Sequence, residues 1–288
     1  MGFVTPVGTN GTRSHSTVNK VSFNVLGGHS YGNTAFEFGS LYNVNTHFTK
    51  GFQFAGIANY TGSSDGAAQM AGITNIASDG VSPFQLAGIA NIADEVSGLQ
   101  MAGIVNIAKR VRGVQLGLVN ISDECEGVPV GLINIVKKNG KHEFELSFSE
   151  TLNTAVSFRL GTDRLYTIFS GGVRYLESPT EYALGIGFGT HIDWKNNWAN
   201  QIELVGYSVT KDGSFDNDGV NMLTQLRLPV SKELSCGLKL FAGPVVNMTI
   251  SDVEEKGEDT IGPWNMWSSN HGDTRLKGWV GLVAGVRF

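Results

Sequence analysis

Large apolar and polar residues alternate along the second half of this chain. In "EYALGIGFGTHIDW" (residues 181–194) the large apolar side chains fall on one side of the pattern, at Tyr182, Leu184, Ile186, Phe188, Ile192 and Trp194. A period of two is typical of a β-strand with one apolar face. The pattern recurs in "HEFELSF" (142–148), in "LNTAVSFRL" (152–160) and over 234–250. The last segment is longer than the roughly nine to eleven residues that a tilted strand needs to cross a bilayer.

The first half repeats one phrase. "QMAGITNI" (69–76) returns as "QLAGIANI" (85–92) and as "QMAGIVNI" (100–107). Aligned on its asparagine, the phrase recurs at intervals of 14 to 16 residues, at Asn43, Asn59, Asn75, Asn91, Asn106, Asn120 and Asn134. Short Gly-, Asp- and Ser-containing segments separate the copies, as turns require. Each repeat is therefore expected to be about one strand and one tight turn.

The turns between repeats alternate in charge. Those at 61–66, 93–98 and 122–127 are acidic, those at 108–113 and 136–141 are basic, and 77–82 does not fit. Alternation would follow if successive turns lay at opposite ends of an antiparallel meander. The Gln of one strand would then lie near the Asn of the next. A rival arrangement stacks the repeats as a β-solenoid of parallel coils, with residues 141–288 as a separate barrel of eight strands.

Composition narrows the function classes. The chain has 38 Gly and seven Pro, but 41% hydrophobic residues, which favours a folded, β-rich protein. A net charge of −5 gives no basic face for nucleic acid. Cys125 and Cys236 lie far apart and suggest neither a disulfide framework nor a zinc site. The first residues, "MGFVTPVGTN", lack the features of a signal peptide. If the protein is exported, we expect that peptide to lie outside this sequence.

Two motifs resemble a known class. The terminal segment "RLKGWVGLVAGVRF" (275–288) ends on Phe288 and resembles the C-terminal strand of bacterial outer-membrane β-barrels, while the "GxQxAGIxN" units resemble the surface-repeat proteins of that class. The resemblance implies an outer-membrane location in a Gram-negative bacterium. It also implies short periplasmic turns, longer external loops, both termini in the periplasm and an even number of strands.

We therefore predict an all-β protein, an antiparallel transmembrane β-barrel of about 14–16 strands. Residues 1–18 are expected to be a periplasmic N-terminal segment and residues 19–288 a single barrel. Its repeat-containing half would span 34–136 and its alternating-strand half 141–288. Long external loops are expected at 210–218 and 251–276.

The polar strand faces are expected to line the lumen of this barrel. The predicted lumen residues carry charges of mixed sign or belong to the repeats: Glu143, Glu145, Arg159, Arg174, Asp193, Glu203, Arg227, Lys239 and Arg287, with Gln69, Gln85, Gln100, Asn75, Asn91 and Asn106. Buried charges are costly unless they are paired or wet. Such a lumen suits a weakly selective channel or a closed barrel filled by salt bridges.

The loops offer few candidates for chemistry. Trp264 and Trp267 are predicted external-loop contacts for a partner. Asp212, Asp216 and Asp218 are a weak calcium candidate, because their loop lacks the terminal Glu of an EF-hand. His191 and Asp193 form a conceivable acid/base pair, but lining of the lumen is the favoured interpretation. No nucleophile and base occur together in the sequence. We therefore expect no catalysis, no bound metal and no cofactor.

The leading functional hypothesis is porin-like passage of small polar solutes without catalysis. The alternative is a plugged structural or interaction barrel that acts as a subunit of an envelope complex. The expected partners are the lipid bilayer and an envelope protein bound through the external loops, and nucleic acid is not expected. An enzyme with its site in the barrel or its loops is a third, less favoured hypothesis.

Overall fold

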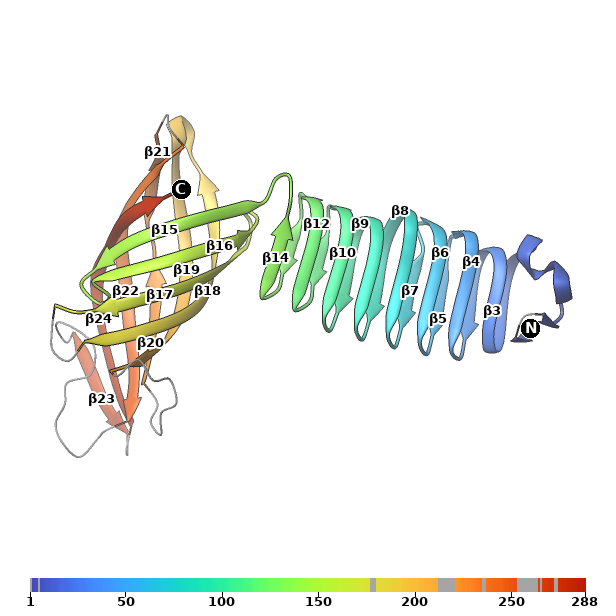
Figure 1. The fold of residues 1–288 in the computed structure, drawn as a ribbon, viewed down its shortest axis with the longest axis horizontal. Helices are drawn as coiled ribbons and strands as arrows, with labels where there is room; N and C mark the ends of the chain where they lie inside the picture. Colours follow the sequence, from blue (N-terminus) through green and yellow to red (C-terminus); the bar gives the residue numbers. More distant parts are fainter. Residues whose placement is uncertain are drawn as a thin grey trace. The chain divides into compact units, whose positions relative to one another are not determined.

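A computed structural model of the chain describes residues 2–4, 6–176, 180–211, 221–234, 237–252, 264, 266–271 and 274–288. It divides the chain into two compact units, Met1–Gly140 and Lys141–Phe288. Each unit has a β-sheet of its own, and no pairing between described strands joins the two sheets (Figure 1).

The first unit is a parallel β-solenoid whose coils stack side by side (Figure 1). Its strands are β1 (Gly2–Val4), β2 (Val7–Gly8), β3 (Val18–Gly39), β4 (Tyr42–Thr49), β5 (Phe52–Ala55), β6 (Ala58–Asp65), β7 (Ala68–Ala71), β8 (Thr74–Ala87), β9 (Ala90–Ala102), β10 (Val105–Val111), β11 (Val114–Leu116), β12 (Val119–Cys125), β13 (Val128–Val130) and β14 (Ile133–Val136).

One sequence repeat makes one coil. β8 and β9 pair in parallel, with Asn75 opposite Asn91 and Gln85 opposite Gln100. Each residue of the phrase therefore lies beside its own copy in the next coil. Between the Gln and the Asn the chain bends at a Gly-Ile or Gly-Leu corner, so both amides point inward. The opposite side of the interior is apolar and contains Ala93, Val96, Ala108, Val111, Cys125 and Val136.

This stacking explains the alternating turn charges. Lys109 lies 2.7 Å from Asp94 in the preceding coil, and Lys137 lies 2.7 Å from Asp123. Arg110 lies between two acidic neighbours, 3.4 Å from Glu95 and 3.6 Å from Glu124. Parallel coils place successive turns at the same edge, where opposite charges pair. The predicted antiparallel meander is therefore wrong.

The corner glycines are required by the close stacking of the coils. A Cβ on Gly72 would collide with the carbonyl oxygen of Gly56, one on Gly88 with that of Gly72, and one on Gly103 with that of Gly88. Backbone oxygens cannot move aside as a flexible side chain can. Glycine is therefore needed at these corners for steric reasons.

The second unit is a closed antiparallel barrel. Its elements are β15 (Lys141–Ser149), β16 (Thr154–Gly161), β17 (Tyr166–Arg174), β18 (Glu181–Asp193), β19 (Trp198–Thr210), β20 (Asn221–Arg227), β21 (Val230–Glu233), β22 (Lys239–Asp252), β23 (Trp267–His271) and β24 (Thr274–Arg287). β20 and β21 both pair with β19 on one side and β22 on the other, so they form one broken stave. β24 pairs with both β22 and β15, which closes a ring of eight staves among the described strands.

The predicted single antiparallel barrel of about 14–16 strands over residues 19–288 is thus wrong. The alternative of an N-terminal solenoid followed by an eight-stranded barrel agrees with the structure. The error has a physical source: a solenoid coil, like a barrel stave, places Gln100 and Asn106 on one face. Pairing direction cannot be read from that pattern.

Helix is scarce in the described part of the chain, where it is limited to two short 3-10 segments, η1 (Gly11–Ser16) and η2 (Lys195–Asn197). None of the helices described is long and apolar enough to cross a membrane.

Candidate functional site

The barrel interior holds a network of buried charges. Arg159 on β16 donates to both carboxylate oxygens of Glu203 on β19, at 3.0 and 3.1 Å. Arg287 on β24 donates to Glu145 on β15 at 2.8 Å and to Glu203 at 3.3 Å. Arg227 on β20 lies 3.5 Å from Glu145. The five side chains come from five staves and are at most 3% exposed.

Neutral groups extend this network. The Tyr166 hydroxyl donates to Glu203 at 2.9 Å. Arg227 donates to the side-chain oxygen Oε1 of Gln225 at 2.7 and 3.0 Å and also contacts the Tyr207 hydroxyl. Three cations and two anions, fixed by tyrosines and an amide, fill the centre of the barrel. Such paired and hydrogen-bonded charges are the arrangement in which burial of ions is tolerated.

Other predicted lumen residues lie toward the barrel ends. Lys239 lies 2.7 Å from Glu143, and Arg174 lies 3.1 Å from Glu181. Asp193 does not line the interior, because its side chain is 76% exposed. Its Oδ1 lies at hydrogen-bond distance, 2.9 Å, from Nε2 of His191.

The outer surface of the barrel is apolar. On β18, Tyr182, Leu184, Ile186, Phe188 and Ile192 are all exposed, while Ala183 is buried. On β19, Trp198, Ile202 and Leu204 are exposed, with Glu203 buried between the last two. Since β18 and β19 pair side by side, these residues form one continuous surface.

The predicted amides of the repeats lie inside the solenoid, not in a barrel lumen. After Gln53, each glutamine donates through Nε2 to the side-chain oxygen Oε1 of the glutamine one coil earlier, over 2.8 Å in every case. The ladder runs through Gln53, Gln69, Gln85, Gln100 and Gln115. It has no further rung at β13, where Pro129 stands opposite Gln115.

The asparagines form a second ladder of opposite direction. Asn75 donates to Asn91 at 2.9 Å, and Asn91 donates to Asn106 at 3.1 Å, each toward the C-terminus. Each of these amides also donates to a backbone oxygen of the following repeat, as Asn91 does to Met101 at 2.7 Å. Both sets of hydrogen bonds thus tie successive coils together.

Glu37 ends the glutamine ladder at the N-terminal side. It stands opposite Gln53 and accepts from Gln53 at 3.1 Å and from Asn45 at 2.8 Å. Asn24 lies 3.5 Å from its other oxygen. Burial raises the pKa of Glu37, and the hydrogen bonds from these three amides oppose that shift.

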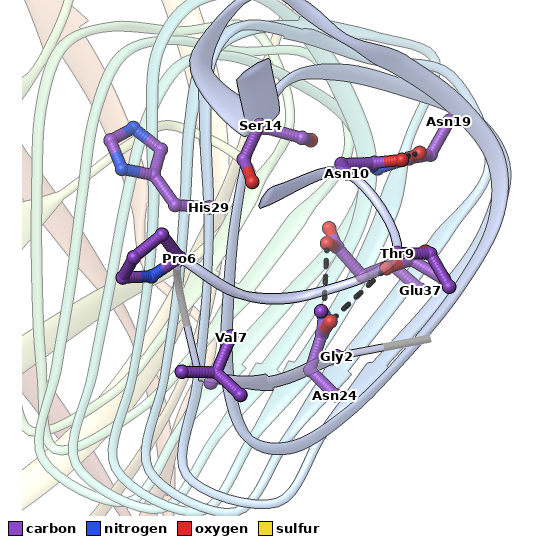
Figure 2. A pocket seen from close by; sticks show the side chains of 14 residues that line it. Gly2, Pro6, Val7, Thr9, Asn10, Ser14, Asn19, Asn24, His29 and Glu37 are labelled. Carbon is purple, nitrogen blue, oxygen red and sulfur yellow. Dashed lines mark hydrogen bonds between the residues drawn. The ribbon is translucent and has the colours of Figure 1, made fainter. Parts of the chain in front are cut away.

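A small polar pocket lies above Glu37. Figure 2 shows Glu37 and Asn24 joined by a hydrogen bond on its lining, with His29 and Pro6 on another side. The cavity measures about 30 Å³, room for roughly one or two waters and far less than an organic ligand needs. We assign it no ligand.

Of the loop candidates, the structure describes only the two tryptophans. Trp264 and Trp267 are each 50% exposed, and the Trp264 indole donates to the Val280 carbonyl at 3.3 Å. Asp212, Asp216 and Asp218 lie outside the described residues. Within the described residues, no three His, Cys, Asp or Glu side chains gather in a group able to hold a metal ion.

Sequence reasoning missed two features. Glu37 occupies the glutamine position of the degenerate phrase "FEFGSLYN" (36–43), a substitution that alignment of the repeats could have revealed. Each phrase also carries a Leu or Ile two residues before its asparagine. The exposure of this Leu or Ile follows only from its place at the corner of the coil.

Comparison with known proteins adds no assignment: no family model matches the chain, and no match of significance was found among curated proteins or solved structures.

Proposed function

We propose that this protein is a non-catalytic interaction protein of the bacterial outer membrane. Its eight-stranded barrel anchors the chain with a plugged lumen, and its solenoid and loops serve contact with other envelope components. The observation that carries the proposal is the inverted polarity of the barrel, which is charged inside and apolar outside. A barrel dissolved in water would bury its apolar face instead.

The dimensions of the apolar surface support a bilayer setting. On β18 it runs from Tyr182 to Ile192, and Trp194 and Trp198 lie just beyond its end. At about 3.3 Å per residue and a tilt of about 45°, this stretch spans ~25 Å, close to the apolar band of outer-membrane barrels. Aromatic side chains at both ends fit the interfacial girdles of such barrels.

The filled interior favours anchoring over solute passage. A pore lumen of this class is lined by wet charges, whereas Arg159, Glu145 and Glu203 are fully buried. Opening a path would require breaking charge pairs in a medium of low dielectric constant, which costs several kcal/mol (order of magnitude). Porin-like passage is therefore the less supported of the two expected functions.

Contact with a partner is assigned to the exposed tryptophans. Trp264 and Trp267 lie against β24, where Trp267 stands opposite Gly278 and the Trp264 indole reaches the Val280 carbonyl, and both side chains offer large apolar area at half exposure. Tryptophan is among the residues that contribute most to protein interfaces.

The test is to refold the chain in detergent and reconstitute it into a planar bilayer. We expect a heat-modifiable band on a gel, resistance of residues 141–288 to protease after insertion, and no conductance steps. A chain that stays soluble and unfolded with lipid present would contradict the anchoring role. Discrete conductance steps would contradict the plugged lumen and favour the porin-like hypothesis instead.

A paired variant sharpens the test. The double variant Arg159→Ser, Glu203→Ser removes both partners of the ion pair at the centre of the network, so neither partner of that pair is left as a buried charge. We expect intermittent current through this variant, whereas the native chain should give none. Arg164→Ser, at an exposed turn, is the control.

A further inference from the structure

The solenoid carries an apolar ridge along one edge. Every coil places a leucine or isoleucine at the corner between its Gln and Asn positions, and all eight are 36–50% exposed: Leu26, Leu41, Ile57, Ile73, Ile89, Ile104, Leu118 and Leu132. Stacked at the strand spacing of about 4.8 Å, they form a ridge ~35 Å long.

The flanks of this ridge are apolar too. Phe54, Met70 and Leu86 lie on one side and line a shallow groove together with Phe38 and the small residues of the corner. On the other side, Tyr60, Ile92 and Ile107 are exposed. The edge is thus apolar across several rows of side chains.

Charge is confined to the opposite edge. Residues 51–134 contain ten charged side chains, and each of them lies between the asparagine of one repeat and the glutamine position of the next. The solenoid is therefore amphipathic in the same sense as a helix that lies in a membrane interface, with a charged side and an apolar side.

The two edges have diverged differently within one set of repeats. The turn positions have become acidic in some coils and basic in others, as Asp94 and Lys109 illustrate. The corner has exchanged only leucine for isoleucine. Because all coils share the same repeat, this difference indicates a requirement for an alkyl side chain at an exposed position.

The backbone at the ridge is suited to an environment without water. The corner amides bond from coil to coil: Ile73 donates to Ile57 and Ile89 donates to Ile73, each at 3.0 Å. The nearest side-chain amides, such as Asn75 and Gln85, are buried and hydrogen-bonded. Lipid contact demands that backbone polar groups be satisfied in this way.

We propose that the solenoid rests on a phospholipid bilayer through this ridge, with the corner leucines and isoleucines at the boundary of headgroups and acyl chains. A fluid bilayer suits a uniform, convex ridge one side chain wide at its crest. A second copy of the chain would need a complementary surface with a polar rim, and about 800 Å² on each partner. The proposal rests on the proposed function in one respect: the barrel, which begins at the residue after Gly140, brings the solenoid to the bilayer.

The test measures lipid contact at single positions of the full chain. An environment-sensitive fluorophore is attached at Ile89→Cys, with Cys236→Ser and the buried Cys125 kept, in vesicles of phosphatidylethanolamine and phosphatidylglycerol. Doxyl-labelled phospholipid should quench roughly half of the emission and the spectrum should shift to the blue. The same label at Lys109→Cys, on the charged edge, should show neither effect.

A triple variant tests whether the quenching depends on the apolar ridge. Ile57→Asp, Ile73→Asp and Ile104→Asp change exposed corners, so circular dichroism should show an intact fold. Quenching at position 89 should fall to the value at position 109. Substitution of Asp79, Asp94 and Asp123 by asparagine should leave it unchanged.

Equal, weak quenching at positions 89 and 109 would overturn the proposal. So would disulfide formation between copies through the cysteine at position 89, because a second chain would then cover the ridge. Barrel insertion is measured separately, by the heat-modifiable band. If the barrel fails to insert, the proposed function fails, and quenching of the vesicle-bound chain at position 89 still decides whether the ridge meets lipid.

Discussion

Glu37 takes the place that glutamine holds in the next five coils, and its carboxylate is buried among amides. Neutral donors partly satisfy it, but none of these hydrogen-bond partners, Asn24, Asn45 and Gln53, carries a charge. Ionisation is therefore harder in the fold than in the unfolded chain. This single residue should make the solenoid sensitive to pH.

We expect the solenoid to lose stability as the pH rises. Since burial raises the pKa of Glu37 above its ordinary 4.5, the folded state binds the proton more tightly than the unfolded state. The contribution is fully present below about pH 4.5 and is lost as the pH rises through the raised pKa. Hydrogen exchange of the solenoid amides, measured across this range, should show falling protection.

Glu37→Gln should remove that slope, because a neutral amide has no proton to lose. Glu126→Gln, on the surface, serves as the control for general effects of charge. An unchanged pH profile in the Glu37→Gln variant would show that another group is responsible.

A second residue-scale prediction concerns the corner glycines. Gly88→Ala would place a Cβ against the Gly72 carbonyl oxygen and force the two coils apart. We expect a loss of about 1–3 kcal/mol, the usual cost of overpacking. Urea dependence of amide exchange in β8 and β9 measures it. Ala90→Ser, a partly exposed position two residues away, should have no comparable effect.

At the scale of elements, the ladders link coils more strongly than individual hydrogen bonds would suggest. Asn91→Ala removes one hydrogen bond that Asn91 accepts and two that it donates. The Asn75 amide then loses its acceptor at position 91, and the Met101 carbonyl loses its donor there. Unsatisfied buried groups cost about 1–3 kcal/mol each. We expect a loss of about 3 kcal/mol, measured by amide exchange.

The coupling along the ladder can be measured as well. In a cycle with Asn75→Ala and Asn91→Ala, the double variant should lose less than the sum of the single variants, because neighbouring rungs share a bond. Additive losses would contradict a cooperative ladder.

The elements also mark where sequence reasoning succeeds and fails. The alternation in "EYALGIGFGTHIDW" correctly predicted which side of β18 is apolar and exposed. The charges of the turns led to the wrong topology, because alternating signs are compatible both with a meander, whose successive turns lie at opposite ends, and with a solenoid, whose successive turns lie side by side and pair. The five-residue spacing of Gln115 and Asn120 conflicts with a straight strand, but both residues are buried. A corner one residue shorter accommodates them, and only the coil geometry reveals it.

Within the barrel, the strongest prediction concerns Arg159. Arg159→Leu would leave Glu203 and Glu145 with less neutralisation in a buried setting. Removal of one partner from a buried ion pair costs about 3–5 kcal/mol. The temperature at which the folded band disappears from a gel should fall. Arg164→Leu, at an exposed turn, should leave that temperature unchanged, and an equal fall in both variants would contradict the role of the network.

At the scale of the whole molecule, the chain combines two solutions to the same problem of closing a β-sheet. The solenoid stacks parallel coils around amide ladders, and the barrel closes antiparallel staves around ion pairs. Each has its own hydrogen-bonding network, and no described strand pairing crosses from one sheet to the other. The chain should therefore unfold as two cooperative units.

The two units can be followed by separate probes. All five tryptophans lie beyond residue 190, so their fluorescence reports the barrel, while amide exchange of residues 18–136 reports the solenoid. Asn91→Ala should weaken the exchange protection and leave the fluorescence transition in place. Arg159→Leu should do the reverse. If either variant shifted both transitions equally, the units would stabilise each other, and the boundary at residue 140 would mark a change of topology within one cooperative fold.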